Sequence, residues 1–232
     1  MKDVMCGQAQ VFEPFTDHTL GDPAVNGFLH RPAGSSRHGL VLTHGAGGNC
    51  KVPLLVALAS AFAAEGVTVL RCDLPYRQAR PKGPPSPARA ARDRQGLKHA
   101  LFAIRRITTG PAIVAGHSYG GRQASMLLAG EPELAAALLL LSYPLHPPGR
   151  AELRTAHFHD LRTPTFFVHG SADGFGSLEE IEAARRLVAA PTALLAVEGA
   201  RHDLYRGRPS PAAAQQTAER IAREFLAWMA AR

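Results

Sequence analysis

Cysteines, aromatic residues and long apolar runs are all scarce in this chain of 232 residues. Its three cysteines, Cys6, Cys50 and Cys72, form no CxxC pair, which predicts reduced thiols rather than a disulfide framework. The longest apolar run, 134–141, is far shorter than the roughly 20 residues that a membrane-spanning helix needs. Residues 1–15 lack the apolar segment of a signal peptide. We therefore expect a cytoplasmic protein that does not enter a membrane.

Acidic side chains are also in the minority, because 26 lysines and arginines face 19 aspartates and glutamates, giving a formal net charge of +7. A basic chain suggests a nucleic-acid partner. Here the cations are spread along the sequence, are mostly arginine, and accompany no zinc-finger, helix-turn-helix or RNA-binding motif. The histidines at 146, 157 and 159 have no carboxylate or cysteine at metal-ligand spacing. We expect neither a nucleic-acid partner nor a metal or other cofactor.

What the chain has instead is an alternation of short apolar runs with longer helical patterns, within a length typical of one domain, 1–232. The expected strands occupy 8–12, 25–29, 39–43, 67–71, 111–115, 135–141, 165–168 and 192–197. The expected helices occupy 53–65, 88–106, 121–129, 177–189 and the chain from 211 onward. Solid apolar strands that alternate with helices predict an α/β fold, a mostly parallel sheet with helices on both faces. The first two strands should form an edge hairpin.

The stretch G-H-S-Y-G at 116–120 lies between an expected strand and an expected helix. A serine between two glycines at such a corner is the pattern of a nucleophile elbow. The sharp turn strains the backbone of Ser118, and a side chain at Gly116 or Gly120 would collide across it. Because glycine is common here, with 22 residues, the pattern is weak evidence until an acid and a histidine follow it.

Such residues do follow, each just past the carboxyl end of an expected strand, where open parallel sheets bind their ligands. Asp173 follows the strand at 165–168, and His202 follows the last strand. Two other aspartates compete with Asp173. Asp160 precedes its strand, and Asp203 adjoins His202, where it is badly placed to orient the imidazole ring. The order serine, aspartate, histidine is that of the α/β-hydrolases.

Four short motifs in order now make the chain resemble a small α/β-hydrolase from Gly39 to its C-terminus: H-G-A-G-G at 44–48, G-H-S-Y-G-G at 116–121, H-G-S-A-D at 169–173 and G-A-R-H at 199–202. Within that superfamily it resembles the dienelactone-hydrolase-like enzymes. The testis-expressed-protein-like branch is especially similar, with L-R-x-x-x-P-Y at 70–76. Dienelactone hydrolases proper use a cysteine nucleophile, whereas this chain has Ser118, so the resemblance does not extend to a dienelactone substrate.

Chemistry assigns the roles. His202 would take the proton of the Ser118 hydroxyl and later protonate the leaving group, and Asp173 would hold the imidazole in the right tautomer. The backbone N–H groups of Ala46 and Tyr119 would form the oxyanion hole. Three further histidines, at 44, 117 and 169, are expected to be buried structural residues that bond to the backbone.

The surroundings of the site are predicted from two segments. The segment at 142–162 is too short for a helical cap domain, so the site should be open. The segment at 73–87 reads as a proline-rich, cationic loop past the end of a strand. Tyr76, Arg77 and Arg80 in this loop, together with Lys82, would line the site and attract an anionic substrate. The alternative is an ordinary solvated loop.

The prediction is a serine hydrolase that cleaves a small carboxylic ester or thioester through an acyl-enzyme, with the cationic segment favouring an anionic substrate. One alternative is a binding or scaffold protein on a hydrolase fold, since the branch that this chain resembles includes a subunit of a chromatin-modifying assembly, and fold does not fix function. The other alternative is an acyltransferase that uses the same residues. The oligomeric state and the acyl chain are not readable from the sequence.

Overall fold

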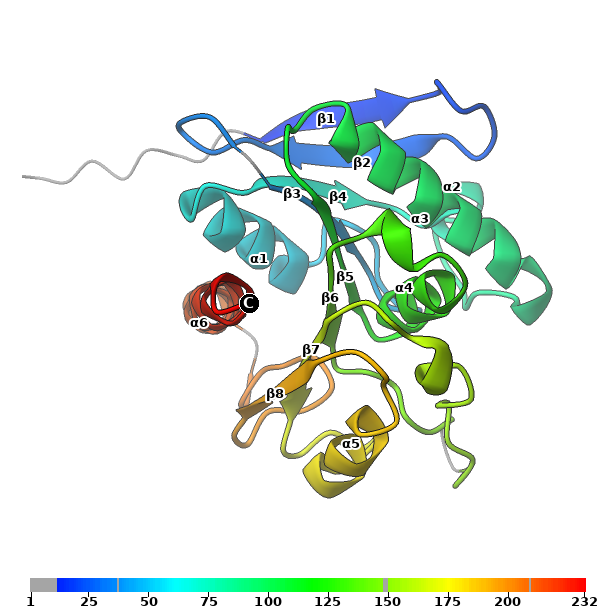
Figure 1. Ribbon diagram of the computed structural model, residues 1–232, viewed down its shortest axis with the longest axis vertical. Helices are drawn as coiled ribbons and strands as arrows, with labels where there is room; N and C mark the ends of the chain where they lie inside the picture. Colours follow the sequence, from blue (N-terminus) through cyan, green and yellow to red (C-terminus); the bar gives the residue numbers. More distant parts are fainter. Residues whose placement is uncertain (1–11, 37, 148–149, 209) are drawn as a thin grey trace, which may run out of the picture.

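A single eight-stranded sheet forms the centre of the computed structural model, which describes residues 12–36, 38–147, 150–208 and 210–232 (Figure 1). Strand order across the sheet is β1 (Phe12–Asp17), β2 (Val25–His30), β4 (Thr68–Cys72), β3 (Gly39–Thr43), β5 (Ala112–His117), β6 (Ala137–Leu141), β7 (Thr165–Gly170) and β8 (Thr192–Val197). All the pairs from β4 to β8 are parallel. The carboxyl ends of these strands therefore lie along one edge of the sheet.

The two leading strands form the expected antiparallel hairpin at one edge of the sheet. Phe12 pairs with His30 and Asp17 with Val25, and β2 in turn pairs antiparallel with β4. The first predicted strand, 8–12, lies outside the described residues except for Phe12, where β1 begins. Each of the other predicted strands is confirmed to within about two residues at its ends.

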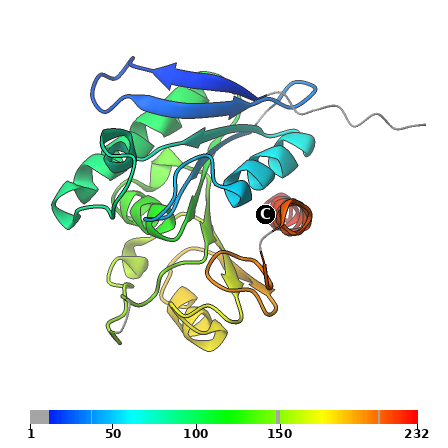
Figure 2. The same cartoon turned by 180° about the vertical axis from the view of Figure 1, so that it is seen from behind.

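Helices cover both faces of the sheet, as predicted. On one face lie α1 (Pro53–Ala64) and α6 (Pro211–Ala230), which pack against each other; the opposite face carries α3 (Ala90–Arg105), α4 (Tyr119–Gly130) and α5 (Leu178–Arg185) (Figures 1 and 2). The S-x-x-E pattern at Ser177 forms a capping box at the start of α5, and Ser210 caps α6, whose first residue is Pro211.

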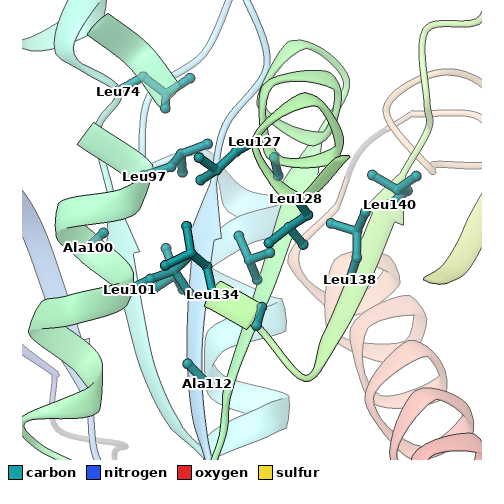
Figure 3. Close-up of a cluster of buried hydrophobic side chains, with 14 of the residues drawn as sticks. Leu74, Leu97, Ala100, Leu101, Ala112, Leu127, Leu128, Leu134, Leu138 and Leu140 are labelled. Carbon is teal, nitrogen blue, oxygen red and sulfur yellow. The ribbon is translucent and has the colours of Figure 1, made fainter. Parts of the chain in front are cut away.

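The face of α3 and α4 shows how the apolar spacing of these helices builds the core. Leu97 and Leu101 of α3 lie on one side of Leu128 of α4, with the strand leucines Leu138 and Leu140 on its other side, and none of the five is exposed to solvent (Figure 3). Burial of a leucine side chain stabilises the fold by about 1.5–3 kcal/mol. This core packs α4 against β5 and β6 and α3 against β5, and thus fixes the corner between β5 and α4.

Two connecting segments differ from plain loops. The segment predicted as a loop at 73–87 contains a short helix, α2 (Pro75–Ala79), so this part of the prediction is wrong. Proline fits the first turn of a helix because it lacks only an N–H that would be unpaired there, and the next N–H, that of Tyr76, is bonded by the Asp93 carboxylate. Between β6 and β7 the described residues form a single 3₁₀ turn, Phe158–Asp160. Within the described residues, no helix is long and apolar enough to cross a membrane.

Candidate active site

A sharp corner between β5 and α4 presents Ser118. Its backbone has φ 50° and ψ −115°, a conformation that L-residues rarely adopt. The corner closes because its glycines have no side chain. A Cβ on Gly116 would lie 2.3 Å from the Gly121 nitrogen, and a Cβ on Gly120 would lie 2.6 Å from the His44 carbonyl oxygen. The steric reading of this motif is thus confirmed.

A chain of hydrogen bonds joins the serine, histidine and aspartate that the sequence singles out. The His202 Nε2 atom lies 2.8 Å from the Ser118 Oγ atom. On the other side of the ring, Nδ1 lies 2.8 Å from Oδ2 and 3.1 Å from Oδ1 of Asp173. The three residues come from the ends of β5, β7 and β8, which the parallel sheet brings to one edge. This arrangement lets the imidazole accept the hydroxyl proton while Asp173 holds the Nδ1–H.

The Asp173 carboxylate is well suited to this contact. It is 7% exposed, and Oδ1 also accepts the Phe175 N–H at 2.9 Å. Burial by itself raises the pKa of a carboxyl group, but hydrogen bonds from His202 and Phe175 outweigh it and hold the pKa of Asp173 below its usual range. The rival Asp203 is exposed and caps the Tyr205 N–H instead, while Asp160 is exposed at the end of its 3₁₀ turn.

The backbone groups expected to form the oxyanion hole lie beside Ser118. Tyr119 is the first residue of α4, so its N–H has no acceptor within the helix. Ala46 lines the same cavity as Ser118 and belongs to the loop at 44–48. In the peptide group that joins Gly45 to Ala46, the Gly45 carbonyl accepts hydrogen bonds from the His44 ring and the Tyr76 hydroxyl. In a trans peptide the N–H points opposite to the carbonyl, so the Ala46 N–H is directed away from these two rings.

Tyr76 and Arg77 lie behind that loop rather than along an open wall. The Tyr76 hydroxyl donates to the Gly45 and Ala46 carbonyls, each at 3.0 Å, and Arg77 Nη2 donates to the Ala46 carbonyl at 2.9 Å. Tyr76 is 4% and Arg77 6% exposed. Arg80 is exposed and bonds to the Pro84 carbonyl. The hydrogen bonds of Tyr76 and Arg77 position the loop backbone; contact of these three side chains with substrate stays a prediction.

Residues 36–230 match the family described as alpha/beta hydrolase domain. The chain belongs to this alpha/beta hydrolase family. The fold of this chain is similar to that of an alpha-beta serine hydrolase homologue from Coxiella burnetii. The TM-score is 0.71 at 18% identity, over 91% of this chain and 96% of that one.

Two further solved structures have similar folds. A dienelactone hydrolase from Anabaena variabilis has a TM-score of 0.69 at 18% identity, over 94% of this chain and 98% of that one. A serine hydrolase without lid from Xanthomonas campestris has a TM-score of 0.69 at 16% identity, over 94% and 96%. The predicted α/β-hydrolase fold is confirmed, and between β6 and β7 the described residues form no helical cap, as expected.

Two cavities meet at Ser118. The first, of about 450 Å³, runs past His202 and is lined by apolar side chains that include Leu54 and Phe175. The second, of about 690 Å³, runs past Tyr119 toward α3 and the proline-rich segment at 84–87. A substrate whose scissile carbonyl lies over Ser118 can therefore extend to either side.

Among the described residues no group of three or more His, Cys, Asp or Glu side chains could hold a metal ion.

The other histidines near the site of the α/β-hydrolase bond to the backbone, as predicted. His44 contacts the Gly45 carbonyl, His117 the His202 carbonyl at 2.8 Å, and His169 the Gly176 carbonyl at 2.9 Å. Burial lowers the pKa of His117 to about 4, so its ring is neutral at pH 7. Nε2–H of His117 can then donate to the carbonyl of the candidate base and fix the backbone of that residue.

Two residues that contribute to the site, Asp93 and Phe175, are not predicted from the sequence. Asp93 of α3 is 1% exposed, and its carboxylate accepts the Tyr76 N–H at 2.9 Å and the Tyr119 hydroxyl at 2.7 Å. It thereby ties α2, whose Tyr76 supports the loop of Ala46, to the start of α4, which carries Tyr119. Phe175 packs its ring against His202, with centroids 4.2 Å apart. The pattern of α3 offers only one sign, a carboxylate on the helix face that packs on the sheet; nothing in the sequence marks Phe175.

Proposed function

We propose that this α/β-hydrolase cleaves a small carboxylic ester or thioester through an acyl-enzyme on Ser118. The observation that carries the proposal is the continuous contact from Ser118 Oγ through the His202 ring to the buried Asp173 carboxylate. A serine hydroxyl is a weak nucleophile until a base accepts its proton, and this contact supplies that base.

In the first half of the reaction, Ser118 Oγ attacks the substrate carbonyl carbon while its proton passes to His202 Nε2. The carbonyl oxygen becomes an oxyanion, stabilised by the Tyr119 and Ala46 N–H groups. The tetrahedral intermediate collapses, the bond to the leaving alcohol or thiol breaks, and His202 returns its proton to that group. Asp173 stays ionised throughout and stabilises the imidazolium.

In the second half, water replaces the leaving group. His202 takes a proton from the water molecule as its oxygen attacks the acyl-enzyme, and the same N–H groups stabilise the second oxyanion. Collapse breaks the bond to Ser118 Oγ, which regains a proton from His202, and the carboxylic acid is released. The absence of a cap in the described part of the chain favours small substrates over long acyl chains, which would need an enclosing wall.

A fluorophosphonate probe tests this proposal against the scaffold alternative, because the probe reacts with activated serines and not with ordinary ones. The wild type should be labelled on one peptide, the one that contains Ser118, and Ser118→Ala should abolish the label. His202→Ala keeps the serine but removes the base, so its labelling should fall by orders of magnitude. Labelling that persists in Ser118→Ala, or a wild type that resists the probe, would reject the nucleophile and favour a binding role.

A further inference from the structure

The second cavity beside Ser118 has a wall of arginines. Arg94 comes from α3, Arg122 lies one turn beyond Ser118 in α4, and Arg154 comes from the segment between β6 and β7. All three side chains are half-buried. Segments that lie far apart in the sequence thus bring three guanidinium groups to one cavity, which also reaches Ser118 and Tyr119.

These arginines lack the acidic partners that other arginines of the chain have. Arg92 contacts Asp22 and Arg185 contacts Glu182. In the described part of the chain, by contrast, no carboxylate lies within 4.0 Å of the guanidinium groups at 94, 122 and 154. Glu152, an exposed neighbour of Arg154, acts on it only at longer range. The wall therefore carries positive charge with no ion-paired carboxylate among the described residues.

Hydrogen bonds within the protein use only part of the donor capacity of this wall. Arg94 Nη1 donates to Gln123 Oε1 at 3.0 Å, and Arg154 Nη1 reaches the Pro144 carbonyl only at 3.4 Å. The Arg122 Nε atom is buried without a partner among the described residues. Gln123, which also lines the cavity and is fully buried, has an Nε2 atom with no partner within the same described part of the chain. Unpaired buried donors cost free energy, which a bound acceptor would recover.

The electrostatics of the wall also favour a bound acceptor, and one with negative charge. Burial, followed by the charge of Arg122, lowers the pKa of Arg154. Burial and the same Arg122 charge lower the pKa of His157 to about 4. Like charges held close together repel one another until a counter-ion arrives. A carboxylate matches the planar fork of a guanidinium group with two parallel hydrogen bonds, and this geometry gives specificity as well as affinity.

From these observations we propose that Arg94, Arg122 and Arg154 form a subsite for a carboxylate group of the substrate. The preferred substrate then carries a carboxylate on one side of its scissile ester and an apolar group, placed in the first cavity, on the other. This inference rests on the proposed function, and it locates anion recognition on the α4 side of Ser118 rather than at Arg77 and Arg80.

The test compares two pairs of esters, because the carboxylate can belong to the acyl or to the alcohol part. The first pair is the mono-para-nitrophenyl ester of glutaric acid and the same ester with its free carboxyl capped as a methyl ester. The second pair is para-carboxyphenyl butyrate and its methyl-capped form. In one pair the wild type should favour the carboxylate in kcat/KM by about 10-fold to 100-fold, the range expected for hydrogen bonds to a charged group.

Arg122→Gln and Arg154→Gln should each reduce that ratio by about 10-fold, because each removes one guanidinium from the anion. Arg92→Gln is the matched control, since it removes an exposed arginine of α3 that pairs with Asp22, outside the cavity. It should keep the wild-type ratio. No preference in either pair, or a preference that survives both substitutions, overturns the subsite. A phosphonate analogue of equal length that is preferred to the carboxylate overturns the assignment to carboxylate.

Binding to Ser118→Ala separates this inference from the proposed function. That variant cannot form the acyl-enzyme, so melting temperature reports binding alone. The carboxylate ester of the preferred pair should raise the melting temperature, its methyl-capped form should not, and Arg122→Gln in the same background should remove the rise. This result would uphold the subsite even if no ester were turned over, and its absence in an enzyme that hydrolyses the neutral esters would reject the subsite alone.

Discussion

The groups on the two sides of Ser118, the proposed nucleophile, approach it by different means. On one side, His202 and Asp173 approach it with their own side chains, each placed at the end of a strand. On the other side, the approaching groups belong to the backbone of the loop at 44–48, and the Tyr76 and Arg77 side chains behind it fix its course. Under the proposed mechanism, loss of a side chain on the first side removes a group that acts in the reaction. Loss of a supporting side chain on the second side only misplaces a backbone group that remains.

The largest effect should come from the first side. Asp173→Asn should lower kcat by about 10⁴-fold with little change in KM. The amide group of asparagine can donate to Nδ1 of His202, which favours the tautomer that carries its proton on Nε2, facing Ser118, so the ring cannot accept the hydroxyl proton. Steady-state kinetics on an ester that the wild type hydrolyses measures the effect. Asp203→Asn is the matched control and should stay near the wild-type rate. Damage by Asp203→Asn in place of Asp173→Asn would refute the proposed orientation of His202.

A smaller loss is expected on the second side. Tyr76→Phe removes the hydroxyl that donates to the Gly45 and Ala46 carbonyls. The Ala46 N–H survives but is less well aimed, so kcat should fall by about 10-fold to 100-fold, less than the loss of a triad member. Arg80→Ala, on the same segment but exposed, should change the rate by less than about twofold. Equal behaviour of the two variants would mean that the loop does not depend on its buried support.

Measurements of activity at acid pH, on either side of Ser118, require that the loss of folding stability at acid pH is known. Buried His30 is expected to contribute to that loss. His30 is 1% exposed, and burial together with the neighbouring Arg71 charge lowers its pKa to about 4 from the usual 6.5. The unfolded chain therefore binds a proton between these pH values that the folded chain does not, so the free energy of unfolding falls as the pH drops from 6.5 toward 4.

His30→Gln should remove this contribution, on the order of 2 kcal/mol between pH 7 and pH 4, while keeping an acceptor for the Arg71 Nε–H. Urea denaturation of the wild type and the variant at both pH values measures it. The variant should lose less stability on acidification than the wild type. An identical pH dependence in the two proteins would show that His30 does not titrate as its burial implies.

The fold and the first side of the site are largely predictable from the sequence because both depend on local patterns. Solid apolar runs predict the strands, and G-H-S-Y-G at 116–120 fixes the corner by close approach of backbone atoms. Asp173 and His202 follow strand ends, and parallel pairing necessarily brings those ends together. The exclusion of Asp160 and Asp203 also follows from position alone, and the hydrogen bonds agree with it.

The second side depends on contacts that no local pattern contains. The cationic residues at 77 and 80 look alike in sequence, yet the short helix α2 turns Arg77 inward to bond with the loop carbonyls and leaves Arg80 outside. Asp93 matters only because two tyrosines from other segments reach it. Likewise Arg122 and Arg154 share a cavity through tertiary folding alone. Pairing between distant segments, not residue type, decides these roles.

The position of Ser118 at the junction of two cavities has a consequence for turnover. Under the proposed mechanism the acyl group and the leaving group lie in different cavities, so the first product can depart without passing the second. Its departure empties one cavity while the other still holds the acyl group. The vacated space then gives water a path to the acyl-enzyme while the acyl group stays bound, so one cavity would serve first the leaving group and then the water.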